Sequence, residues 1–144
     1  MPDETTAPAT LAIEERGEIA LVLEGDTYVL RPSYEAIESF ETATGKGLVQ
    51  LSREAIEGRL RLGETAQIAA ECIRAWGRAK NRPSVAGVNA VRIAELIIES
   101  EAGVIGASRT LATMLAMAAT GGYTAQGEAK AGTMTTTAEV PAAS

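Results

Sequence analysis

A predicted β-hairpin, a proline and a predicted helix near the N-terminus constrain the fold more than any other part of this chain. Two apolar segments, residues 18–24 and 27–31, flank Gly25-Asp26, a pair that supplies the positive φ of a tight two-residue loop. Pro32 then ends the second segment, because proline cannot donate a hydrogen bond to a strand ladder. The sequence therefore predicts a hairpin followed at once by a different element.

The loop position predicts the register of the hairpin. With Gly25-Asp26 as the loop, Leu21 faces Leu30 and Leu23 faces Tyr28. A lone two-stranded ribbon is marginal in water, so its more apolar face needs a cover. The residues expected on that face, and to form the fold, are Ile19, Leu21, Leu23, Tyr28 and Leu30.

A helix is predicted directly after Pro32. Ser33 is a favourable N-cap, and the acidic Glu35 in the first turn suits the helix dipole. Gly45 is expected to end the helix. Its apolar stripe, which should cover the hairpin, consists of Tyr34, Ala36, Ile37 and Phe40.

Further helices are predicted by apolar residues at helical spacing in the rest of the chain. The fold class is therefore α+β and mostly helical, with an N-terminal β-hairpin followed by four to five α-helices. The later helices are expected from Leu48 to Leu62 with Gly63 as the stop, from a Thr65 cap to before Pro83, from a Ser84 cap to about Glu101, and between Gly106 and Thr120.

Composition predicts one small domain. The 144 residues are 46% hydrophobic but only 3% aromatic, which suits a core of alanine and larger aliphatic side chains. Both ends are rich in small and polar residues without periodicity. The expected organisation is an N-terminal tail over residues 1–14, a domain over 15–120 and a flexible tail over 121–144.

Charge and cysteine content narrow the class of protein. A net charge of −6 and a pI near 4.8 argue against a dedicated nucleic-acid binder. The single cysteine, Cys72, excludes an internal disulfide, and no signal peptide is recognisable, so a cytoplasmic location is expected. The weakly charged segment 102–120 contains Arg109 near its middle, which argues against a membrane span.

No catalytic or metal-binding set is recognisable in the sequence. Histidine is absent, which removes the commonest general base and metal ligand. The helical carboxylate pair Glu95 and Glu99 is interpreted as a solvated face, Gly45-Lys46-Gly47 as a cap and turn, and Cys72 as a core residue. We expect a protein that is not an enzyme and uses no cofactor.

A basic cluster is the sharpest surface feature predicted. Four cations fall within residues 74–82 around one tryptophan. Such a cluster either contacts a partner or opposes the negative end of a helix dipole while the tryptophan packs inward. The candidate partner-binding residues are Arg74, Trp76, Arg78 and Arg82.

Several segments resemble a known family. They are similar to the small tail proteins of gene transfer agents and related siphophages, a family described both as tail tube protein and as tail assembly chaperone. The resemblance spans about residues 15–115. The segments that carry it are Gly17–Gly25, Tyr28–Ile37, Glu41 and Thr44-Gly45 with Gly47-Leu48, and later Gly63–Thr65, Ile68–Ala70 and Ile73–Ala75.

The resemblance implies a binding role in the host cell. The family's expected partners are the tape-measure protein, which such a chaperone keeps soluble, and the tail-tube protein, whose subunits it recruits. Two alternatives stay open: a structural component of the tail tube, and a small helical DNA-binding regulator that uses residues 74–82. Homo-oligomerisation also stays open, and no membrane partner is expected.

Overall fold

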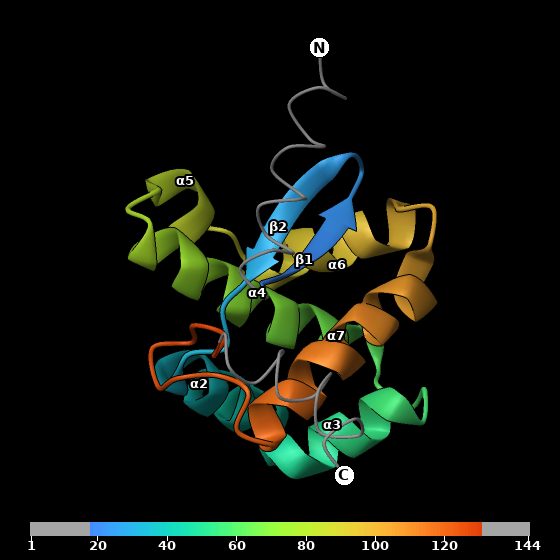
Figure 1. The fold of residues 1–144 in the computed structure, drawn as a ribbon. Helices are drawn as coiled ribbons and strands as arrows, with labels where there is room; N and C mark the ends of the chain where they lie inside the picture. Colours follow the sequence, from blue (N-terminus) through green and yellow to red (C-terminus); the bar gives the residue numbers. More distant parts are fainter. Residues whose placement is uncertain (1–17, 131–144) are drawn as a thin grey trace, which may run out of the picture.

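The computed structural model describes residues 18–130, which form a β-hairpin and six helices, with α4 at the centre (Figure 1). This arrangement confirms the α+β, mostly helical fold class. The predicted N-terminal tail over residues 1–14 and residues 131–144 of the predicted C-terminal tail lie outside the described residues. The elements are β1 (Ile19–Leu23), β2 (Asp26–Leu30), α2 (Tyr34–Thr44), α3 (Leu48–Ile56), α4 (Leu62–Ala79), α5 (Pro83–Ala86), α6 (Ala90–Glu99) and α7 (Gly103–Ala119).

The hairpin forms as predicted, but its register differs. The loop is Glu24-Gly25 and not Gly25-Asp26, so Leu23 pairs with Asp26 and Leu21 with Tyr28. Both loop residues have positive φ, 50° at Glu24 and 83° at Gly25, as a type I′ turn requires. Gly25 therefore occupies the second loop position. Glu24 occupies the first, where its positive φ is unfavourable for a residue with a side chain.

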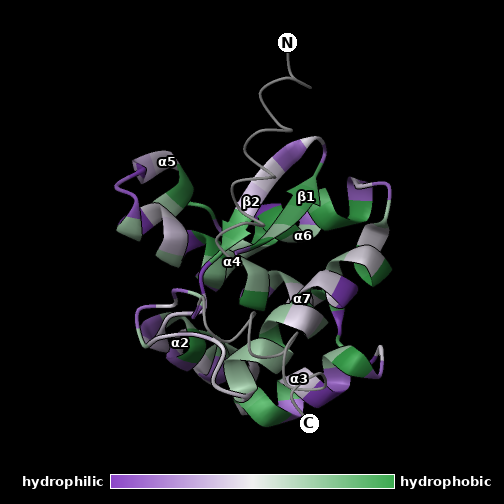
Figure 2. Ribbon diagram, viewed as in Figure 1, coloured by the Kyte–Doolittle hydropathy of each residue, from purple (hydrophilic) through white to green (hydrophobic). Residues whose placement is uncertain are grey.

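The predicted buried face of the hairpin is confirmed despite the register shift. Moving the loop by one residue shifts each cross-strand partner by two positions, which preserves the side on which every residue points. Leu21, Leu23 and Leu30 are buried, and Tyr28 packs against them half-buried. Hydrophobic residues accordingly make up much of β1 and of α6 beside it (Figure 2).

Both predicted caps of α2 are confirmed. The Ser33 hydroxyl accepts a hydrogen bond from the Ala36 N–H at 3.1 Å, and Gly45 ends the helix in the left-handed conformation. The prediction was wrong for Tyr34, which is 62% exposed and donates its hydroxyl proton to Glu38. The tyrosine lies at the first helical position, outside the buried stripe that contains Phe40.

The boundary between α3 and α4 corrects the sequence prediction. α3 ends at Ile56 because Gly58 turns the chain with a φ of 71°. α4 begins at Leu62, so Gly63 lies inside the helix instead of ending the previous one. The predicted cap Thr65 is fully buried in the first turn, while Glu64 accepts the otherwise unpaired Arg61 N–H at 3.0 Å.

The predicted fourth helix is two helices, which explains why residues 18–130 form six helices instead of four or five. The short α5 ends at Gly87, and α6 begins after Asn89, whose side chain accepts the Arg92 N–H at 2.8 Å. Asn89, not Ser84, is therefore the cap. α5 packs directly on α4 at Gly77, where an added Cβ would lie 2.4 Å from the Ala86 nitrogen.

The core surrounds α4, which contacts α2, α5, α6, α7 and β2, while α3 packs on α7. Cys72 is confirmed as a core residue and lies 3.7 Å, sulfur to sulfur, from Met114 of α7. Burial raises the pKa of its thiol. The largest fully buried side chains include Phe40, Leu51, Ile68, Ile73, Ile93, Ile97, Leu111 and Leu115.

The sequence predicted a flexible tail from residue 121; residues 120–130, the described part of the chain after α7, form a loop that is held by hydrogen bonds. It returns to the connection between β2 and α2 (Figure 1), where Ala125 O accepts the Tyr34 N–H at 2.7 Å. Gln126 O also accepts the Arg31 Nε–H at 2.8 Å. Close contact requires glycine at Gly127, whose added Cβ would lie 2.7 Å from the Ser33 nitrogen.

Within residues 18–130, no single helix has the length and apolarity of a span; α6 and α7 satisfy such a test only as a pair bent by 119°.

Candidate partner-binding surfaces

The predicted basic cluster lies at the C-terminal end of α4, and the structure gives its members different environments. Arg74 is engaged within the fold. Its guanidinium lies 2.6 Å from a Glu71 carboxylate oxygen and donates to Val88 O at 2.7 Å, which ties α4 to the segment before α6. This side chain connects helices, and its charge is already paired.

Trp76 and Arg82 lie together at a second location. The Arg82 guanidinium carbon is 5.3 Å from the centre of the indole ring, within cation–π range. Both residues line a cleft of about 410 Å³ between β2 and the α4–α5 connection. We call it the hairpin cleft; it is lined by Asp26, Thr27, Tyr28, Val29, Trp76, Arg82, Ser84, Val85 and Val88.

Arg78 and Lys80 face other hollows. Arg78 lines a cleft of about 550 Å³ together with Tyr34 and the C-terminal loop. Lys80 lies beside Tyr123 in a smaller hollow. The cations that lie close together in the sequence thus face different parts of the surface. Of the four predicted partner-binding residues, only Trp76 and Arg82 are brought into direct contact.

The outer face of α6 is a surface that the sequence prediction did not separate from the core. Ile93 and Ile97 are buried against α4 and α7, while Val91 and Ile98 remain 71% and 61% exposed. The two exposed residues are seven positions apart and so lie on one side of the helix. That seven-residue spacing was the signal available in the sequence.

A compact ion-pair network lies at the opposite end of α4. Lys46 Nζ is 2.9 Å from Glu54 and 2.6 Å from Glu64, and it joins the α2–α3 turn to α3 and to the start of α4. Hydrogen bonding to Glu64 raises the Lys46 pKa, and the Lys46 hydrogen bond lowers the pKa of Glu54. The Gly45-Lys46-Gly47 segment is therefore a helix end whose lysine has a structural role.

No metal centre is formed by the part of the chain that the structure describes: no group of three or more aspartate, glutamate or cysteine side chains is close enough there to hold an ion. Glu35 and Glu38 lie on the solvent side of α2, and Glu95 and Glu99 on that of α6. These carboxylates have the surroundings expected of solvated helix faces.

A model of one protein family, described as "Phage tail tube protein, GTA-gp10", matches residues 16–121. The chain belongs to this family. The match runs from the start of the hairpin to the end of α7, so it includes every helix and strand of residues 18–130. Comparisons with curated proteins and with solved structures found no match. Membership confirms the resemblance to gene transfer agent and phage tail proteins.

Proposed function

We propose that this member of the tail tube protein family is a non-enzymatic tail assembly chaperone. It acts in the cytoplasm of the producing cell, binds an amphipathic helical segment of the tape-measure protein and helps to recruit tail-tube subunits. The exposed outer face of α6 is the observation that carries the proposal, and family membership supports the phage-tail setting and contacts with other tail proteins.

The outer face of α6 has the pattern of a helix-pairing surface. Val91 and Ile98 form an apolar stripe at heptad spacing. Beside it lie Arg92 and Glu95, whose side chains pair at 3.3 Å and are each 56% exposed. An apolar stripe flanked by charges is how amphipathic helices recognise one another. Complete burial of each apolar side chain would contribute about 1.5–3 kcal/mol.

A structural role in the tail tube is the second candidate, favoured by the family's description. A tube subunit repeats in many copies per particle, and each copy contacts its neighbours through fixed interfaces. A chaperone leaves after assembly. The two candidates therefore differ in whether the chain stays in the finished particle.

The first experiment measures both outcomes together. Quantitative mass spectrometry counts this chain in purified particles, and affinity purification from producing cells tests for co-purification of the tape-measure protein. Absence from particles with recovery of the tape-measure protein supports the chaperone. Many copies per particle support the structural candidate and contradict the chaperone.

A pair of matched variants locates the binding surface. Val91→Lys with Ile98→Lys should reduce recovery of the tape-measure protein at least tenfold without loss of helical circular dichroism. The control is Val49→Lys with Ile56→Lys on α3, because these residues have the same spacing and similar exposure, 61% and 65%. If both double variants recover the same amount of the tape-measure protein, the outer face of α6 is not the binding surface.

A further inference from the structure

We propose that the hairpin cleft receives an extended, carboxylate-bearing peptide segment of a partner protein, which adds to β2 as a third strand. This site is separate from the outer face of α6, and the inference does not depend on the proposed chaperone function. Three independent features of the cleft, as residues 18–130 show it, support the proposal: an open strand edge, two shielded polar atoms without hydrogen-bond partners and a cation without an ion pair.

The open edge follows from the observed register. In a two-residue hairpin the closing pair, Leu23 and Asp26, exchanges hydrogen bonds, and bonded pairs then alternate along the ladder. Thr27 and Val29 consequently direct their N–H and C=O groups away from β1 and towards the cleft. Arg31 has the same parity, and its N–H indeed points outward and donates to Cys72 O of α4 at 3.1 Å.

The same bond defines the length of the free edge. At Arg31 the strand touches α4, whereas at Thr27 and Val29 no backbone bond to α4 or α5 exists among the described residues. Two outward-facing residues, about 7 Å apart along the strand, therefore have backbone groups left for an incoming chain. Thr27 is partly exposed, whereas Val29 is only 6% exposed, so pairing at Val29 requires the cleft to open. Val85 and Val88, both half-buried, supply an apolar wall opposite this edge.

Two side chains of the cleft hold shielded polar atoms without hydrogen-bond partners. Over the described residues, Trp76 Nε1 and Thr27 Oγ1 are both buried and both unpaired. A shielded N–H without an acceptor is unfavourable, and native structures rarely retain one without a reason. A peptide carbonyl or carboxylate reaching Trp76 would supply the missing acceptor once the Arg82 side chain moves off the ring.

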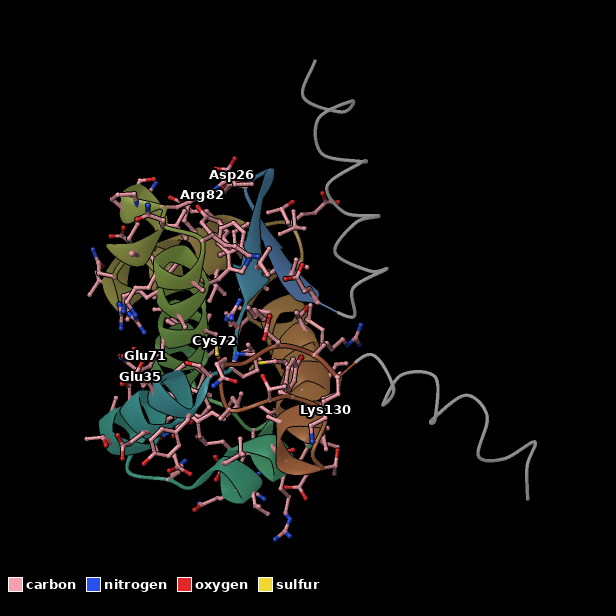
Figure 3. All side chains as sticks on the ribbon, turned by 60° about the vertical axis from the view of Figure 1, so that its left-hand side comes forward. Asp26, Glu35, Glu71, Cys72, Arg82 and Lys130 are labelled. Carbon is pink, nitrogen blue, oxygen red and sulfur yellow. The ribbon has the colours of Figure 1, made fainter. Side chains whose placement is uncertain are left out.

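Charge selects a carboxylate-bearing segment. Arg82 makes no ion pair within residues 18–130; its contact there is with the indole face. Arg82 and Asp26 occupy the same end of the molecule (Figure 3), at the two sides of the cleft. An acidic side chain placed on the Arg82 side gains a charge-assisted hydrogen bond and avoids the like charge of Asp26.

The experiment uses the full chain and a displayed library of random 12-residue peptides. Peptides enriched on the wild-type chain are synthesised, and their affinities are measured by fluorescence polarisation. We expect enrichment of segments that carry Asp or Glu. Arg82→Gln should weaken binding about tenfold or more and Trp76→Phe about two- to tenfold, whereas Lys80→Gln, which removes a charge outside the cleft, should change nothing.

Two further measurements separate strand addition from other contacts. Trp76 is the single tryptophan, so its indole N–H gives one NMR signal, which should move downfield on peptide addition as it gains an acceptor. Methylating every second backbone amide of the peptide should abolish binding in one register and spare it in the other.

The outcomes are decisive in both directions. The site is established by three results together. Acidic peptides bind Arg82→Gln more weakly, they shift the indole signal of Trp76, and methylation abolishes their binding in one register only. The inference is overturned if no peptide is enriched, or if Arg82→Gln and Lys80→Gln bind the selected peptides equally. Melting temperatures of the variants confirm that each is folded, and recovery of the tape-measure protein plays no part in the result.

Discussion

The two ends of α4 both concentrate charge, but they do so in opposite ways. At the N-terminal end, Lys46 pairs with Glu54 and Glu64 in a network whose acidic side chains are only 11% and 12% exposed. At the C-terminal end, the cations beyond Arg74 point towards separate hollows, and no ion pair joins them to any described residue. Charges that satisfy one another hold helices together, while unpaired charges stay available to a partner.

The largest expected effect comes from breaking the paired end. Lys46→Met should lower the melting temperature by several degrees, because it leaves two shielded carboxylates close together without their cation. Lys80→Met removes the same charge from the unpaired end and is the matched control. Thermal denaturation followed by circular dichroism compares them, and equal melting temperatures would contradict the assigned role of Lys46.

Arg74 should behave like the paired end although it belongs to the basic cluster. Arg74→Ala removes the ion pair to Glu71 and the hydrogen bond to Val88 O, and it should cost about 1.5–3 kcal/mol of unfolding free energy. Urea denaturation measures this difference. A loss below about 0.5 kcal/mol would mean that these contacts contribute little in solution.

Acidification tests the paired end without a mutation. Burial raises the pKa of Glu64, but bonds from the Arg61 N–H and Lys46 outweigh it, so the pKa lies below its ordinary 4.5, as does that of Glu54. The stability from a lowered carboxyl pKa is present above pH 4.5 and is lost as the pH falls further. Stability should decrease from about pH 5 towards about pH 3, and less so in Lys46→Met.

The smallest effect should come from the unpaired end. Arg78→Ala with Arg82→Ala should change the unfolding free energy by no more than about 0.5 kcal/mol per residue, because both side chains are exposed. The affinity for the selected acidic peptides, measured on the same variant, should fall instead. A large loss of stability would assign these arginines to the fold and remove the contrast between the two ends.

Local chemistry made part of this fold predictable. The caps Ser33 and Gly45 satisfy backbone groups within a few residues, so their side chain types reveal them. The buried hairpin face was predictable because strand parity survives a loop shifted by one residue. The start of α4 was missed because Arg61, the residue at its N-cap position, is not one of the residue types that usually cap a helix.

For the basic cluster, the sequence predicted which residues are present but not how they are arranged. The sequence located the cations around Trp76, but only tertiary structure distinguishes Arg74, bound to a carbonyl fourteen residues away, from Arg82, which lies over the indole. The open edge of β2 depends on the loop position, which the sequence placed one residue too late. The outer face of α6 required knowing which side of that helix packs on α4.

The bond between the Tyr34 N–H and Ala125 O has a consequence for synthesis. Its two residues are about 90 positions apart, and the acceptor lies beyond the last residue matched by the family. Domains acquire contacts in the order in which the ribosome delivers the chain. The connection from the hairpin to α2 therefore gains this bond only after about 90 further residues have been translated.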